Sequence, residues 1–383
     1  MKYVVLVPDG CADEPLAELG GKTPLQAAAM PALAGLAARA EVGRAAVIPN
    51  GLPPGSDVGN MAILGYDPAE YHTGRAPIEA AAMGVELGPG EVAYRCNLVT
   101  VDDAGTMVDF AAGHPTNEQS HPIVAALQEE LARDGIRFHP GVEYRHLCVV
   151  PTDLGNSECV PPHDLTGQPA VLPTGPAAPA LIDLMDASRP IVRAAAGQVD
   201  SPATQIWLWG QGIRPQLPTF ASRYGVEGRL TSAVDLVRGL GVLTGIEVLD
   251  VAGATAGFDN DYKAQTEAAV RSLADRDLFV LHVEATDEAG HQGDAAEKTA
   301  QLERWDQDVI GPLTDALAEM GPHRVLLLPD HATPCAARTH TSDPVPYLLY
   351  DSERPGPGGV YTEADTRDRP VIAAHELMAR LVA

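Results

Sequence analysis

The chain has 383 residues, 45% of them hydrophobic, and a formal net charge of −26 from 26 Lys plus Arg against 52 Asp plus Glu. A globular chain of this length can bury two cores. Its negative field repels nucleic acid and anionic membrane surfaces, so neither is expected as a partner. An anionic small molecule can still bind, but only through a local cluster of cations or metal ions.

The cysteines and the N-terminus indicate a cytoplasmic protein. The five cysteines are odd in number, scattered and without CxxC spacing, which is typical of reduced thiols rather than of disulfides or a cysteine zinc site. The opening "MKYVVLVPDG" is too short for a signal sequence or a membrane span and predicts a first buried strand at 3–7. The sequence is compatible with a monomer or a homo-oligomer.

Short apolar runs alternate with helical stretches in the first and last parts of the chain. Such runs, separated by helices, are typical of a parallel sheet covered on both faces. The predicted strands are 3–7, 43–49, 247–253, 278–284, 324–330 and 345–350, and the predicted helices are 31–40, 262–275 and 295–320. We therefore expect an α/β fold with a mostly parallel sheet.

The middle of the chain differs in pattern. It contains "YRCNLVTVDD", a helical stretch at 120–134, "EYRHLCVVP" and "IWLWG". We predict a smaller α/β domain at 91–215, inserted into a domain made of 1–90 and 216–383. The "GGKTP" at 20–24 lacks the glycine that a phosphate-binding loop needs at Leu16, so no nucleotide cofactor is expected.

Polar side chains follow several of the predicted strands. Asp9 comes after the first strand, and Asp330 and His331 come after the strand at 324–330. In open α/β sheets, ligands bind beyond the carboxyl ends of the strands. Pro-Asp-Gly is also an ordinary turn, but its near-repetition as "LPDH" favours a site.

Two further strands contribute residues to the same predicted edge. Asp287 and His291 follow the strand at 278–284, four residues apart and so on one helical face. His340 precedes the strand at 345–350. We expect Asp287, His291 and His340 to form one metal site, and Asp9, Asp330 and His331 a second. Carboxylates mixed with imidazoles suit two divalent ions, Mn²⁺ first, with Zn²⁺ or Mg²⁺ as alternatives.

A single serine stands at a predicted helix start in "PPGSDVGNMAILG". As an N-cap, Ser56 would be worth about 1 kcal/mol. As a metal-bound hydroxyl at a helix N-terminus it could act as a nucleophile toward phosphate. Two ions a few ångströms apart serve such transfer chemistry. We favour the nucleophile.

These motifs resemble those of the archaeal-type branch of cofactor-independent (2,3-bisphosphoglycerate-independent) phosphoglycerate mutases, in the alkaline phosphatase superfamily. The resemblance covers essentially the whole chain. It is carried by "PDG" (8–10), "PPGSDVGNMAILGYDP" (53–68), "YHTGRAPIEAAAMG" (71–84), "TSAVDLVRGLG" (231–241), "HVEATDEAGHQGD" (282–294), "LPDHATP" (328–334) and "RTHTSDPVP" (338–346).

The resemblance implies interconversion of 3-phosphoglycerate and 2-phosphoglycerate through a phosphoserine at Ser56. It implies one metal held by Asp9, Ser56, Asp330 and His331 and another held by Asp287, His291 and His340. It further implies an inserted domain that binds a small phosphorylated carboxylate.

Substrate choice is less defined than the transfer chemistry. "VDFAAGH" (108–114) and "GVEYRHLCVVP" (141–151) are closer to a bacterial subgroup proposed to be homoserine kinases. Homoserine or a phosphonate analogue of phosphoglycerate is therefore the alternative substrate. Cations that could offset the negative charge are the substrate-binding candidates: Arg75, Arg95, His114, Arg145 and Lys263.

Overall fold

The chain forms two compact units in a computed structural model that describes all 383 residues. Unit 1 comprises 1–72 and 216–383, and unit 2 comprises 73–215. Unit 2 thus begins before the expected position 91, because helix α5 (Ala76–Ala82) packs against strands of unit 2. None of the helices is both long and apolar enough to cross a membrane.

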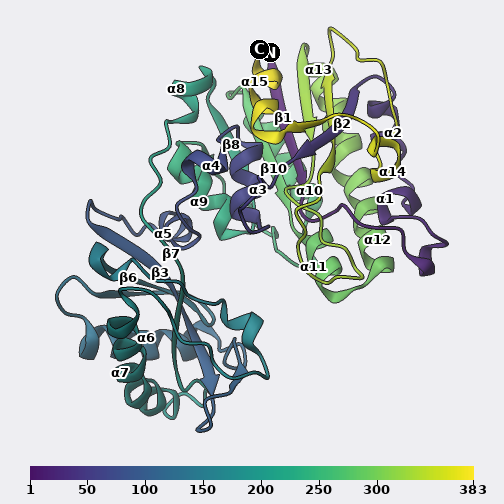
Figure 1. The fold of residues 1–383 in the computed structure, drawn as a ribbon. Helices are drawn as coiled ribbons and strands as arrows, with labels where there is room; N and C mark the ends of the chain where they lie inside the picture. The colour runs from purple at the N-terminus through teal and green to yellow at the C-terminus, as the bar shows by residue number, and fades with distance from the viewer. The chain divides into compact units, whose positions relative to one another are not determined.

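Unit 1 is built on an eight-stranded sheet in the order β13-β2-β12-β11-β1-β10-β8-β9 (Figure 1). The strands are β1 (Lys2–Pro8), β2 (Glu41–Ala46), β8 (Gly228–Thr231), β9 (Glu247–Val248), β10 (Leu278–Val283), β11 (His323–Leu327), β12 (Val345–Asp351) and β13 (Val371–Ala373). β1 pairs in parallel with β10 and β11, whereas β12 is antiparallel to β11 and β2. The predicted α/β class with a mostly parallel sheet is confirmed.

The register of the central strands brings their carboxyl ends to one edge. Pro8 of β1 lies opposite Val283 of β10, and Leu6 lies opposite Leu327 of β11. Because β12 runs in the other direction, its first residue, Val345, lies at this same edge. The segments that follow β1, β10 and β11 therefore meet the segment that precedes β12.

Helices cover both faces of the sheet in unit 1 (Figure 1). They are α1 (Pro24–Ala27), α2 (Pro31–Ala37), α3 (Ser56–Ile63), α4 (Pro68–Tyr71), α8 (Phe220–Tyr224), α9 (Asp235–Thr244), α10 (Tyr262–Leu273), α11 (Ala285–Gln292), α12 (Ala295–Trp305), α13 (Gly311–Met320), α14 (Glu363–Thr366) and α15 (Leu377–Val382). The predicted helix at 295–320 is divided by a π-helical turn at Asp306–Ile310. In that turn the Asp306 carboxylate accepts the first N–H groups of α2, from Ala32 and Leu33.

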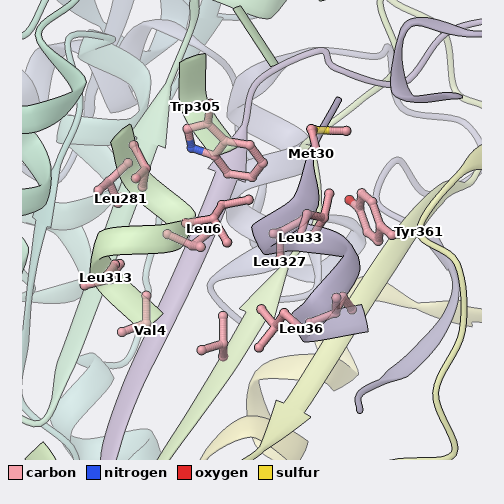
Figure 2. Close-up of a cluster of buried hydrophobic side chains, with 14 of the residues drawn as sticks. Val4, Leu6, Met30, Leu33, Leu36, Leu281, Trp305, Leu313, Leu327 and Tyr361 are labelled. Carbon is pink, nitrogen blue, oxygen red and sulfur yellow. The ribbon is translucent and has the colours of Figure 1, made fainter. Parts of the chain in front are cut away.

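The largest apolar cluster of unit 1 joins one face of the sheet to these helices. Figure 2 shows Leu6 of β1 among side chains of α2, α12 and α13, including Leu33, Trp305 and Leu313. All four side chains are at most 3% exposed. Full burial of such a side chain stabilises the fold by roughly 1.5–3 kcal/mol, so this cluster fixes the position of β1 and of the turn that follows it.

Unit 2 contains a five-stranded antiparallel sheet with helices on it. The strands are β3 (Glu91–Val101), β4 (Met107–Asp109), β5 (Arg137–Val142), β6 (Arg145–Pro151) and β7 (Gln205–Gly212), and the main helices are α6 (Asn117–Leu131) and α7 (Ala178–Ala196). Tyr94 and Cys96 of β3 pack with α6 and α7, whereas Ala93 packs with α5. Side chains alternate along a strand, so Arg95 faces the same side as Ala93.

Candidate active site

Seven side chains predicted from the sequence lie together at the carboxyl edge of the unit 1 sheet. Asp9 follows β1, Asp330 and His331 follow β11, and α11, directly after β10, carries two more. The full set is Asp9, Ser56, Asp287, His291, Asp330, His331 and His340. The sheet register described above is the reason that Asp9 and His340, 331 residues apart in sequence, reach one place.

Asp287, His291 and His340 form one part of this cluster. Nε2 of His291 lies 3.2 Å from Oδ2 of Asp287, and Nε2 of His340 lies 3.5 Å from Oδ1. The two imidazole Nε2 atoms are 2.9 Å apart. One ligand atom from each residue lies within 4.8 Å of the others, so the three side chains can hold one cation.

Asp9, Asp330, His331 and Ser56 form the other part. Nε2 of His331 lies 3.4 Å from Oδ1 of Asp9 and 3.6 Å from Oδ2 of Asp330. Ser56 Oγ lies 3.3 Å from the same Nε2. The ligand atoms of Asp9, Asp287 and His331 also lie within 4.8 Å of one another, so Asp287 is close to both parts.

The hydrogen bonds around His331 test whether the site fits a metal ion. Thr333 donates its hydroxyl proton to the Asp287 carboxylate. The Thr333 oxygen can therefore only accept from Nδ1 of His331, 3.1 Å away, which leaves the His331 Nε2 lone pair facing Asp9. Both carboxylate oxygens of Asp9 are buried without a hydrogen-bond donor. Carboxylate oxygens without a donor, beside an imidazole nitrogen, fit a cation between them.

His291 is oriented in a related way. Its Nδ1 donates to the carbonyl oxygen of Arg338, 3.1 Å away, so Nε2 faces Asp287. The hydrogen bond to Asp287 raises the pKa of His291 to about 9. When no metal cation is bound, a proton on His291 Nε2 thus takes the place of the cation.

The carboxylates differ in their protonation. Burial, reinforced by Asp330 and Asp287, raises the pKa of Asp9 well above its usual range. Burial also opposes ionisation of Asp287, but its contacts with His291 and His340 outweigh burial and hold the pKa of Asp287 well below its usual range. Asp9 is therefore the carboxylate that gains most from a bound cation.

Ser56 is the first residue of α3, and the N-cap position belongs to Gly55. Ser56 is therefore not the N-cap residue of this helix. The helix lies close to the segment that follows β11: a Cβ at Gly59 would lie 2.0 Å from the carbonyl oxygen of Asp330. Glycine at this position allows Ser56 to reach the cluster.

Sequence reasoning missed three residues that surround the cluster. His282 lies within β10. Its signal in the sequence is a histidine inside an otherwise apolar run. Asn60 was part of the serine motif, and it donates to Ser56 O (3.0 Å) and to Asp330 Oδ2 (2.7 Å). Thr333 links His331 to Asp287, as described above.

The cationic candidates of unit 2 gather around two aromatic side chains. Nε of Arg95 lies 3.0 Å and Nε of Arg75 lies 3.3 Å from oxygens of Glu79. Both guanidinium groups lie over the Trp209 ring, at 4.5 Å for Arg95 and 5.9 Å for Arg75. Burial lowers the pKa of Arg95 to about 10, so the group stays charged at neutral pH.

His114 and Arg145 meet at the second aromatic side chain, Tyr144. The His114 ring lies 5.3 Å from the Tyr144 ring, and the Arg145 guanidinium lies 5.7 Å from it. Arg145 is exposed and makes no ion pair. Lys263, the fifth candidate, belongs to α10 of unit 1, where it is 70% exposed and faces Asp308. Lys263 therefore belongs to a different unit from the other four candidates.

Comparisons with known proteins identify the family of the chain. A family model described as 2,3-bisphosphoglycerate-independent phosphoglycerate mutase matches residues 37–196. A protein of that name from Methanosarcina acetivorans is 44% identical, with 100% of each chain covered. Another from Methanothrix thermoacetophila is 47% identical over 92% of this chain and 91% of its own. The chain belongs to the family of 2,3-bisphosphoglycerate-independent phosphoglycerate mutases.

Solved structures show the same fold. A Pyrococcus horikoshii protein has a TM-score of 0.79 at 26% identity, covering 99% of this chain and 96% of its own. The cofactor-independent phosphoglycerate mutase from Thermoplasma acidophilum has a TM-score of 0.66 at 25% identity, covering 100% and 99%. The expected family and enzyme class are therefore confirmed.

The His291–Asp287 contact predicts a pH dependence in chelator-treated protein. The folded-state pKa of His291, about 9, lies above the ordinary value of about 6.5. Its stabilising contribution is therefore complete below about pH 6.5 and is lost as the pH rises through about 9. Urea unfolding of the wild type and of His291→Gln should show the wild-type advantage shrinking across this range.

A matched measurement with saturating Mn²⁺ serves as the control. A bound cation replaces the proton, so the advantage of the wild type should no longer shrink between pH 6.5 and 9. A pH-independent difference between the two chelated proteins would contradict the assigned contact.

Proposed function

We propose that the chain interconverts 3-phosphoglycerate and 2-phosphoglycerate through a phosphoserine at Ser56, with two divalent ions at the site. The observation that carries the proposal is the placement of Ser56 Oγ, 3.3 Å from His331 inside the cluster of carboxylates and imidazoles. Family membership gives the substrate class. The proposal concerns a small phosphorylated carboxylate and no nucleotide.

Ser56 and Asn60 have different roles in the proposed transfer. Ser56 Oγ bonds to phosphorus as the O3–phosphorus bond breaks, and the proton lost by Ser56 is balanced by one gained at O3. The O2 hydroxyl of the same glycerate then takes the phosphoryl group, and its proton returns to Ser56. Asn60 holds the Ser56 carbonyl and Asp330 in place during both halves.

One set of residues, Asp9, Ser56, Asp330 and His331, would hold one ion, and Asp287, His291 and His340 the other. Divalent ions at such a pair of sites stabilise the charge on the attacking and leaving oxygens. Mn²⁺ suits the mixture of carboxylates and imidazoles, as do Zn²⁺ and Mg²⁺. The three carboxylates cannot themselves attract a phosphate, so the ions supply the positive charge.

Unit 2 is proposed to bind the carboxylate end of the substrate. Arg95 is held by Glu79 and Trp209, and Arg145 is exposed on Tyr144. Guanidinium groups bind carboxylates in a bidentate manner. Retaining the glycerate while Ser56 carries the phosphate is what separates a mutase from a phosphatase, and exclusion of water supports the same outcome.

Phosphorus NMR with Mn²⁺-loaded protein tests the function. Isomerisation of 3-phosphoglycerate without ATP is expected. Turnover that requires ATP and homoserine would instead establish the alternative phosphotransferase, and isomerisation of a phosphonate analogue alone would establish the other alternative substrate.

Replacement of the nucleophile should abolish transfer and spare the fold. Because Ser56 is not the N-cap residue of α3, Ser56→Ala should change stability by no more than about 1 kcal/mol. Loss of a covalent nucleophile should lower the rate by many powers of ten. Retention of a tenth of the activity, a barrier change of only about 1.4 kcal/mol, would rule out the phosphoserine route.

Arg145, the exposed arginine that lies over Tyr144, should affect whether the phosphate is transferred to O2 or released. Arg145→Ala is expected to lower isomerisation and to raise the ratio of free phosphate to 2-phosphoglycerate, because the glycerate is held less firmly. Arg95→Ala should do the same but also destabilise unit 2, since it leaves Glu79 with one partner fewer. Free phosphate and 2-phosphoglycerate are measured in the same reaction.

Arg189→Ala is the matched control, because Arg189 is an exposed arginine of unit 2 that pairs only with Asp186 on its own helix. It should leave both rate and partition unchanged. If Arg145→Ala and Arg95→Ala also leave both unchanged, neither arginine holds the substrate.

A further inference from the structure

We infer that His282 is a metal ligand: its Nε2 coordinates a divalent cation together with the carboxylates of Asp9 and Asp330. The motifs that carry the family resemblance place no ligand role on this histidine. The inference deepens the proposed function and rests on it only in requiring divalent ions at the site.

His282 lies inside β10 and is fully buried with Asp9 and Asp330. Its Nε2 is 3.1 Å from Oδ2 of Asp9, whereas the other oxygen, Oδ1, faces His331 at 3.4 Å. One ligand atom each from Asp9, His282 and Asp330 lies within 4.8 Å of the others. Asp9 thus presents one oxygen to each of two imidazoles.

The contact between His282 and Asp9 is not a hydrogen bond. Despite the short distance, neither His282 Nε2 nor either oxygen of Asp9 has a hydrogen-bond partner, because the Asp9 oxygen lies off the line of an Nε2–H bond. Two ligands of one cation approach each other side by side in this manner. A buried imidazole nitrogen and a buried carboxylate without partners would otherwise be costly.

The far side of the His282 ring is anchored as metal-binding histidines are. Nδ1 lies 3.1 Å from Ser232 Oγ, and the N–H of Val234 donates to the same oxygen. His291 and His331 have the same arrangement, with Nδ1 on an oxygen of the protein and Nε2 toward the cluster. Such outer contacts fix the tautomer and the orientation of a ligating imidazole.

Proton NMR of Co²⁺-loaded protein labelled with ¹⁵N-histidine provides the test. Each cobalt-bound imidazole gives a strongly shifted exchangeable N–H signal. We expect His282→Asn to lose one shifted signal that the wild type shows, and Ser232→Ala to move that same signal while keeping it. If His282→Asn does not fold, the Ser232→Ala spectrum decides alone.

His146→Asn is the matched control, because His146 is also buried with an unpartnered Nε2 but makes no ion pair with a carboxylate. It should retain every shifted signal. The inference is overturned if His282→Asn loses none, or if no shifted signal moves in Ser232→Ala. Isomerisation is measured separately on Mn²⁺-loaded wild type, so an inactive protein that still shows the His282 signal would refute the proposed function and leave the ligand assignment intact.

Discussion

Three carboxylates buried within a few ångströms of one another are the constraint on which the site depends. Asp9, Asp287 and Asp330 are at most 6% exposed, and burial disfavours the charged state of each. The neighbouring imidazoles offset only part of this charge, because burial keeps His331 and His282 neutral by lowering their pKa values, that of His282 to about 4. The divalent cations that we propose would complete the balance, so we expect metal binding and the stability of this edge to be coupled.

The turn after β1 shows how the fold treats a buried carboxylate that is not part of the site. Asp13 lies four residues after Asp9 and is equally buried, but Lys298 of α12 donates to it at 2.8 Å. The same ammonium group donates to the carbonyl oxygens of Ala12 and Thr333, which ties the segments after β1 and β11 together. The Lys298 ammonium group thus stabilises Asp13, whereas the cation for Asp9 would be a metal ion that we propose. Breaking such a buried pair typically costs about 3–5 kcal/mol.

The part of the site that could be predicted from the sequence follows from one rule, that polar residues after buried parallel strands meet at one edge. Asp9, Asp330 and Asp287 follow this rule directly. His340 does so only because β12 is antiparallel, which places the start of that strand at the same edge. His282 could not be found in this way, because it lies within a strand and only the pairing of β1 with β10 brings it to Asp9.

The two arginines of unit 2 that we connect with the substrate differ in their freedom. Arg95 is 6% exposed, fixed by Glu79 and stacked on Trp209, so its guanidinium loses little entropy when it binds an anion. Arg145 is exposed, makes no ion pair and lies over the ring of Tyr144, so it can adjust to a ligand but must be ordered by it. A fixed cation favours affinity and an adjustable one tolerates a substrate whose phosphate changes position. The reaction that we propose would use both kinds of cation, since the glycerate would have to remain bound while its phosphorylated oxygen changes from O3 to O2.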